Sequence, residues 1–243
     1  MKLHTRILSV LLAVLMLSGL ALTACNKSGG KGGASSSHRE VKNVEPAGQV
    51  VIGTVTEPNG DWTRGAFSAN NATDSAVCTL TDNLDTVTTD EGGSYVINNT
   101  VVEKYTRTED ADGNATYTLK IKEDLKFNNG EPITAENYVA WTLFMISPAG
   151  QEYGATSAAY NVIPGGPDYK DGTVPYLAGV RLLGDYEFSF TTLKTGYDGN
   201  PNLPYYYDLG NAGARCVNLT YWFGEGWHVK DDGQGCYFVN DGG

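Results

Sequence analysis

The sequence predicts a mixed α/β fold with β-hairpins and few helices. Two pairs of strand-like segments each flank a turn that contains glycine, and one amphipathic helical stretch lies between the two pairs. Alternation of apolar and polar residues is typical of a strand with one buried face, whereas apolar residues three and four positions apart indicate a helix. The chain has 243 residues, of which 41% are hydrophobic, so it can bury a core of its own.

The predicted folded part begins with a β-branched run. Residues 49–55 (QVVIGTV) are interpreted as a buried strand, because a short apolar run rich in valine and isoleucine is typical of one. Proline and glycine in residues 56–61 (TEPNGD) then predict a loop.

The first hairpin is predicted for residues 101–108 and 115–122, which flank the turn sequence DADGN at residues 110–114. Apolar and polar residues alternate along residues 117–121 (YTLKI), which is the period of a half-buried strand. The Asp-Gly pair favours a hairpin turn. It does not fit a calcium loop, in which glycine takes the sixth position rather than the fourth.

The helix is predicted to begin after Thr134 and to end before Pro148. Threonine is a suitable N-cap, and Glu136 lies near the positive end of the helix dipole. Proline cannot continue a helix, so Pro148 marks its end. The apolar face carries Tyr138, Trp141 and Met145.

A second hairpin is predicted around Gly184 and Asp185. Residues 180–183 (VRLL) precede this turn, and residues 186–190 (YEFSF) follow it with aromatic and polar side chains in alternation. Both segments have the length and pattern of strands joined by a tight turn.

The N-terminus has the layout of an export signal. Lys2 and Arg6 precede a long apolar stretch, and residues 1–24 are interpreted as the signal peptide. The sequence LTAC at residues 22–25 resembles the lipobox of bacterial lipoproteins, which implies that Cys25 becomes the lipidated N-terminus. The alternative is an uncleaved membrane helix, since an apolar segment of about 18 residues can span a bilayer.

The most specific segment is at residues 117–139 (YTLKIKEDLKFNNGEPITAENYV). This hairpin followed by a helix resembles a signature of the bacterial extracellular solute-binding proteins of family 5, the oligopeptide and dipeptide receptors of ABC importers. The strand at residues 49–55 and the hairpin near Asp185 match this family more loosely. The resemblance implies a periplasmic-binding-protein-like lobe.

The same resemblance implies a domain organisation. Residues 25–47 are a flexible tether rich in glycine and serine, and residues 48–243 are the N-terminal portion of a solute-binding domain. Members of the family are longer, with a second lobe that closes around the ligand, so we expect an incomplete, truncated form without that lobe.

The implied function is ligand capture rather than catalysis. The implied partners are an oligopeptide or another small solute, the permease of an ABC importer, and membrane lipid through Cys25. The implied location is the extracytoplasmic face of a bacterial cell membrane.

The resemblance places the loop after the first strand at the ligand cleft. Thr56, Glu57 and Pro58 are therefore candidate ligand contacts, and the Glu57 carboxylate can pair with a cationic group. The alternative for Glu57 is that it caps a surface turn. Trp62 lines a side-chain pocket or, alternatively, packs in the core.

Charge and motif content exclude several functions. The chain carries 28 acidic and 17 basic side chains, a formal net charge of −11, which argues against a nucleic-acid partner. We identify no catalytic, metal-binding or phosphate-binding motif, and we expect no catalytic residue, metal or cofactor. His228 has no visible acid partner and is expected at the surface. The cysteine spacing allows a Cys216–Cys236 disulfide with Cys78 left free.

The competing interpretation is a surface-anchored carbohydrate-binding protein or hydrolase. Such a protein would use the aromatic residues at 205–207 and 222–227 together with exposed acids. Three acidic pairs lie in glycine-rich turns, where we expect them to be solvated rather than opposed across a substrate. These pairs are Asp90 with Glu91, Glu109 with Asp110, and Asp231 with Asp232.

Overall fold

The structure is a computed structural model that describes residue 48 and residues 51–60, 71–81, 84–155, 159–194 and 214–242. One structural unit extends from Gly53 to Gly243. The signal sequence, Cys25, the tether, Trp62 and residues 205–207 lie outside the described residues. In the described part, no helix is long and apolar enough to cross a bilayer.

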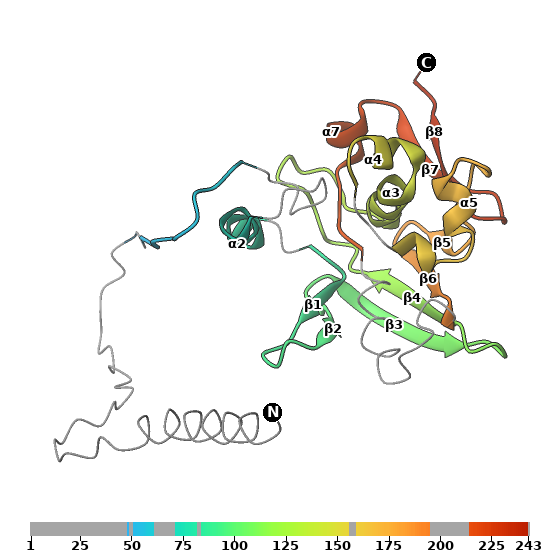
Figure 1. Cartoon of the computed structure of the whole chain (residues 1–243), viewed down its shortest axis with the longest axis horizontal. Helices are drawn as coiled ribbons and strands as arrows, with labels where there is room; N and C mark the ends of the chain where they lie inside the picture. Colours follow the sequence, from blue (N-terminus) through green and yellow to red (C-terminus); the bar gives the residue numbers. More distant parts are fainter. Residues whose placement is uncertain are drawn as a thin grey trace, which may run out of the picture. The chain divides into compact units, whose positions relative to one another are not determined.

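This unit contains a four-stranded antiparallel sheet (Figure 1). Its strands, in spatial order, are β3 (Val102–Glu109), β4 (Ala115–Ile121), β6 (Glu187–Thr192) and β5 (Val180–Gly184). The pairs β3–β4 and β5–β6 are the two hairpins that the alternating patterns predicted, and both are confirmed. The mixed α/β class is confirmed as well.

The turn between β3 and β4 is fixed by its own side chains. Gly113 has a φ of +82°, a conformation that side-chain-bearing residues rarely adopt. The Asp110 carboxylate accepts hydrogen bonds from the backbone amides of Asp112 and Asn114, both at 2.9 Å. The acidic string therefore forms a hairpin turn, as predicted.

Helix α3 (Ala135–Ile146) begins and ends where the sequence predicted. Thr134 is its N-cap, and the Asn137 side-chain oxygen accepts from the Thr134 backbone amide at 2.8 Å. Ser147 ends the helix, and its hydroxyl accepts from the Gly150 amide in the short helix α4 (Pro148–Glu152). Nine of the twelve residues in α3 are buried, which is a wider buried surface than one apolar stripe requires.

The core lies between α3 and the sheet. Burial alternates along β4, so one face of this strand packs inward. Tyr138 of α3 stacks on Phe188 of β6 with ring centroids 5.6 Å apart, and Phe188 in turn meets Phe190 edge-on at 5.4 Å. Side chains from both hairpins and from α3 belong to the same buried cluster.

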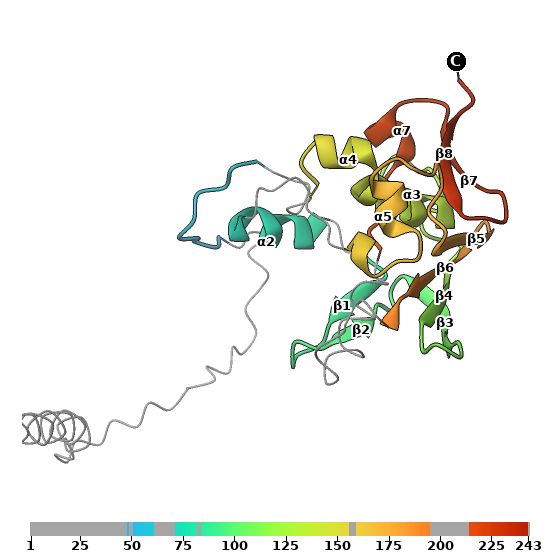
Figure 2. The same ribbon diagram turned by 45° about the vertical axis from the view of Figure 1, so that its right-hand side comes forward.

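The unit contains several other elements besides the four-stranded sheet, α3 and α4 (Figures 1 and 2). Strands β1 and β2 form one hairpin, and strands β7 and β8 form another. Sequence analysis did not predict these elements. They are α2 (Ala72–Thr81), β1 (Val87–Thr89), β2 (Tyr95–Ile97), the 3-10 turn η1 (Ala159–Asn161), α5 (Gly166–Lys170), α7 (Leu219–Phe223), β7 (Trp227–Asp231) and β8 (Cys236–Asn240).

The predicted strand at residues 49–55 is wrong for its described part. Residues 51–55 have no strand structure, and the exposed fractions of Val51, Ile52 and Val55 are 84%, 73% and 106%. A strand needs a neighbouring strand for its backbone hydrogen bonds. No described strand pairs with this run, so a pattern that suits a buried strand lies exposed here.

The aromatic residues at 222–227 pack inward for the most part. Trp222 meets Trp141 of α3 edge-on at a centroid distance of 5.7 Å, and Phe223 meets Phe144 at 5.3 Å. Helix α7 is thereby fixed against α3. Packing of this kind leaves little of these rings for a carbohydrate ligand.

Cys78, Cys216 and Cys236 are buried free thiols, so the disulfide that the spacing allowed is not formed.

Candidate functional site

The predicted ligand loop lies at the protein surface. Thr56, Glu57 and Pro58 are all exposed. The Thr56 carbonyl accepts from the hydroxyl of Thr73 at 2.7 Å and from that of Thr54 at 3.2 Å. The Glu57 carbonyl accepts from the side-chain amide of Asn71 at 2.8 Å. The backbone of the loop is therefore bound to the residues that begin helix α2.

Asp74 of α2 also binds the backbone of this loop. Its carboxylate accepts from the backbone amides of Asn59, at 3.0 Å, and Gly60, at 3.2 Å. Asp74 is only 2% exposed, so the two amides compensate a buried negative charge. Asn71 caps the same helix, because its side-chain oxygen accepts from the amides of Thr73 and Asp74.

The side chain and the carbonyl of Glu57 differ in their contacts. Its carbonyl is held by Asn71, but no side chain of the described residues pairs with its carboxylate. An exposed carboxylate can accept hydrogen bonds from a ligand ammonium or guanidinium group. Thr56, Glu57 and Pro58 thus lie together, whereas Trp62 lies outside the described residues.

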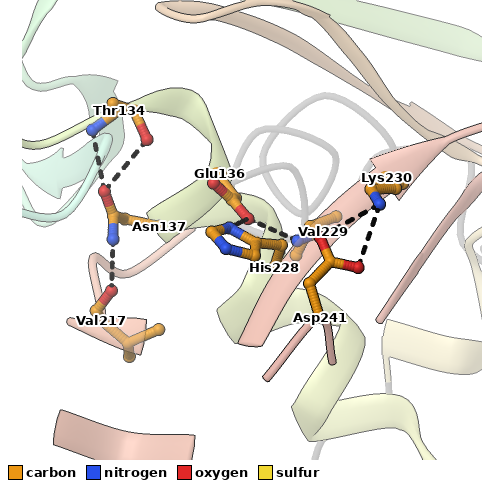
Figure 3. A network of polar contacts seen from close by, with 8 residues as sticks. All are labelled: Thr134, Glu136, Asn137, Val217, His228, Val229, Lys230 and Asp241. Carbon is orange, nitrogen blue, oxygen red and sulfur yellow. Dashed lines mark hydrogen bonds and ion pairs between the residues drawn. The ribbon is translucent and has the colours of Figure 1, made fainter. Parts of the chain in front are cut away.

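A second group of polar contacts joins α3 to β7 (Figure 3). The Glu136 carboxylate accepts from the Val229 backbone amide, and it lies 3.4 Å from Nδ1 of His228. His228 is 51% exposed, so its expected surface position is confirmed. Its acid partner was missed, because Glu136 and His228 are distant in the sequence and no local pattern connects them.

The β5 strand is joined to β7 by a bidentate ion pair. Arg181 donates to both carboxylate oxygens of Asp231, at 2.7 and 2.8 Å, and the Leu182 amide adds a third bond at 3.0 Å. The Asp231 side chain is only 8% exposed, so the expectation of a solvated turn is wrong for this residue. Asp232, Asp90, Glu91, Glu109 and Asp110 are exposed, as expected.

Two pKa values at this contact differ from their ordinary range. Burial would by itself raise the pKa of Asp231, but the hydrogen bonds from Arg181 and from the Gly233 and Leu182 amides outweigh it and hold this pKa below its ordinary range. Burial, with the negative charge of Asp231 nearby, raises the pKa of Cys236 to about 12. The Cys236 thiol is therefore protonated at neutral pH and is not a nucleophile.

A surface groove of about 430 Å³ lies between these two groups of contacts. Two of the carboxylates that line it, those of Glu136 and Asp231, already have partners within the protein. The groove therefore owes its polar character to contacts that hold α3, β5 and β7 together. It is lined by Thr134, Glu136, Leu182, Leu183, Gly184, Asp185, Val229, Lys230 and Asp231.

Within the described ranges, no group of three or more histidine, cysteine, aspartate or glutamate side chains is placed to hold a metal ion.

Comparison with known proteins connects the chain to peptide-binding proteins. No family model matches it. The chain is 28% identical over 195 residues to the oligopeptide-binding protein AppA of Bacillus subtilis (strain 168), a match that covers 79% of this chain and 30% of that protein. It is 30% identical over 128 residues to the dipeptide-binding protein of Lactococcus lactis subsp. cremoris (strain MG1363), covering 44% of this chain and 22% of that protein.

The resemblance to the family 5 solute-binding proteins is confirmed. Both curated relatives are named as binding proteins rather than enzymes. The chain spans less than a third of the length of either one.

Solved structures of the same kind of protein are similar to part of the chain. A periplasmic oligopeptide-binding protein of Borrelia burgdorferi gives a TM-score of 0.49 at 18% identity, covering 70% of this chain and 34% of that one. OppA of Listeria monocytogenes, bound to peptide, gives 0.47 at 19% identity, covering 73% and 36%.

Proposed function

We propose that this chain is the solute-binding component of an ABC importer, which captures extracellular oligopeptides and delivers them to the permease. The observation that carries this proposal is the 28% identity over 195 residues to an oligopeptide-binding protein. Identity over four fifths of the chain is too extensive to come from one shared motif. The proposed role is reversible binding, without any chemical change to the peptide.

The proposed ligand contacts are Thr56, Glu57, Pro58 and Trp62. The first three belong to a surface loop whose backbone is attached to α2, and this leaves their side chains toward solvent. Ligand-binding residues commonly lie on such loops, which a rigid scaffold positions. The Glu57 carboxylate would pair with a cationic group of the peptide.

In the proposed mechanism of a complete receptor, the peptide contacts a body like this one on one side and a second lobe on the other. A ligand that binds the closed arrangement more tightly than the open one shifts the equilibrium toward closure. The closed, loaded receptor is then the form that the permease recognises.

The proposed attachment to the membrane is a lipid on Cys25. Two or more acyl chains hold a protein durably at a bilayer, whereas one chain gives only marginal binding. Residues 26–47, rich in glycine and serine, would separate the folded body from the membrane surface. Replacing Cys25 with serine in the expressed protein should move it from the membrane fraction to the soluble fraction.

The proposed function is tested by adding a mixture of oligopeptides to the full chain. Ligand at 100 times its Kd stabilises the folded state by about 2.7 kcal/mol, which raises the melting temperature by roughly 5 °C or more. Mass spectrometry of the recovered peptides should show them intact. An unchanged melting temperature with every peptide would contradict the proposal, and cleaved peptides would favour the hydrolase interpretation instead.

A further inference from the structure

We propose that Asn71, Thr73 and Asp74 are positioning residues that fix the ligand loop before the ligand arrives. This inference rests on the proposed function, because it concerns the same loop. It assigns a role in binding to three side chains that do not themselves touch the ligand.

The contacts are directed at the backbone of the loop rather than at the side chains of Thr56, Glu57 and Pro58. Thr73 and Asn71 each hold a carbonyl, of Thr56 and of Glu57, while Asp74 holds two amides. The loop is exposed at each residue from 56 to 60, so without these contacts its backbone groups would bind water, apart from the Thr56 carbonyl, which also accepts from the Thr54 hydroxyl. The contacts therefore select one backbone conformation with the side chains of Thr56, Glu57 and Pro58 outward.

The buried carboxylate of Asp74 strengthens the preference for this one backbone conformation of the loop. Asp74 is 2% exposed, and a buried carboxylate that lost its two amide partners would carry an uncompensated charge. Detachment of the loop from α2 would therefore destabilise the helix, which contains Asp74, as well as the loop. Hydrogen bonds to a charged acceptor are about twice as strong as neutral ones.

The attachment also links positions that are distant in the chain. The four bonds join residues that are 14 to 17 positions apart. Ordering such a loop costs conformational entropy. If the loop is already ordered in the free protein, ligand binding does not lose this conformational entropy, and the affinity for the ligand is higher.

The test uses variants of Thr73 with a control in the same helix. Thr73→Val removes the nearer of the two hydroxyls that donate to the Thr56 carbonyl, and Thr73→Ser retains it. Thr79→Val is the matched control, because the Thr79 hydroxyl is exposed and donates to the Ser75 carbonyl within the helix, not to the loop. Asp74→Asn is a fourth variant, which removes the charge.

Two quantities are measured on the full chain: hydrogen exchange of the Asn59 and Gly60 amides, and the Kd for a bound oligopeptide. We expect Asp74→Asn to speed amide exchange and to weaken peptide binding by about tenfold. Thr73→Val should weaken binding about threefold, with wild-type values for Thr73→Ser and Thr79→Val. Circular dichroism of each variant shows whether α2 and the sheet remain folded.

Two results would overturn the inference in distinguishable ways. If wild-type protein binds peptide and Thr73→Val and Asp74→Asn bind it equally well while folded, the positioning role is wrong but the proposed function stands. If wild-type protein binds no peptide, both fail together. An equal loss in Thr79→Val would show that the effect comes from helix stability and would also overturn the inference.

Discussion

Two regions of this molecule were both predicted to form strands but have different structures. Residues 115–121 and 187–192 are apolar strand-like segments that pair side by side and bury their aromatic and aliphatic residues against α3. Residues 51–55 are just as apolar, yet Val55 is fully exposed and no described strand pairs with them. In the first region, β4 and β6 each form a hairpin with the preceding strand in the sequence, and α3 packs against them.

The difference shows that an apolar pattern specifies a strand only when the chain also supplies a neighbour for it. The hairpin turns bring β3 to β4 and β5 to β6 at short range. The loop that follows residues 51–55 is instead attached by four side-chain contacts to α2. We expect the two regions to respond very differently to substitution.

The largest expected effect is for Phe188→Ala in the core. Phe188 is fully buried between Tyr138 and Phe190, so its removal leaves a cavity and should lower the free energy of unfolding by about 3–5 kcal/mol. The matched variant Val55→Ala, at an exposed apolar residue, should change it by less than about 0.5 kcal/mol. Urea denaturation measures both. Equal losses would show that Val55 is packed in solution and that the two regions do not differ.

The next effect is for Asp231→Asn, which breaks the ion pair between β5 and β7. Arg181 is 35% exposed, so water compensates part of the loss, and we expect a decrease of about 2 kcal/mol at pH 7. Asp232→Asn is the control, because Asp232 is the exposed neighbour and should change the stability by less than about 0.5 kcal/mol.

The same pair predicts a pH dependence. The folded-state pKa of Asp231 lies below its unfolded value, so the stabilisation is fully present above the unfolded pKa of about 3.9 and is lost as the pH falls through the folded pKa. The difference between wild type and Asp231→Asn should therefore shrink as the pH is lowered from 6 to 2. A difference that stays constant over this range would contradict the ion pair.

A smaller effect is expected for Asn137→Ala, which removes contacts between α3 and the segment at Val217. The Asn137 amide donates to the Val217 carbonyl at 2.9 Å, and its oxygen holds the Thr134 amide. Loss of both should lower the free energy of unfolding by about 1.5 kcal/mol. The exposed Asn99→Ala should have almost no effect. If both variants unfold like wild type, the helix does not depend on this cap.

The smallest effect is expected for His228→Ala. His228 is half exposed and 3.4 Å from Glu136, and an exposed contact of this kind contributes at most about 1 kcal/mol. Glu136→Ala should cost more, because Glu136 also accepts from the Val229 amide. Thermal unfolding of the two variants measures this order, and the reverse order would contradict the arrangement in Figure 3.

The parts of the fold that sequence predicted are those fixed by nearby residues. Gly113 and the Asp110 turn define one hairpin, and Thr134 and Pro148 bound α3. The contacts that were missed join distant positions. Arg181 and Asp231 are 50 residues apart, and no periodic pattern reveals that one will face the other.

The same distinction applies to the candidate site. The exposed loop at Thr56, Glu57 and Pro58 was expected from its turn residues and from the family resemblance. Its attachment to Asn71, Thr73 and Asp74 was not predicted, because α2 itself has no strong apolar stripe in the sequence and the bonds span about 15 residues. A cap residue such as Asn71 was the only local signal available.

The most direct test of the central proposal, peptide capture through the Glu57 loop, is a comparison of two peptides with two forms of the protein. The peptides are identical oligopeptides that contain either lysine or norleucine at one internal position, and the proteins are wild type and Glu57→Gln. Titration calorimetry should show that wild type prefers the lysine peptide by about tenfold and that Glu57→Gln loses this preference. An undiminished preference in Glu57→Gln, or no binding of either peptide by wild type, would contradict the account.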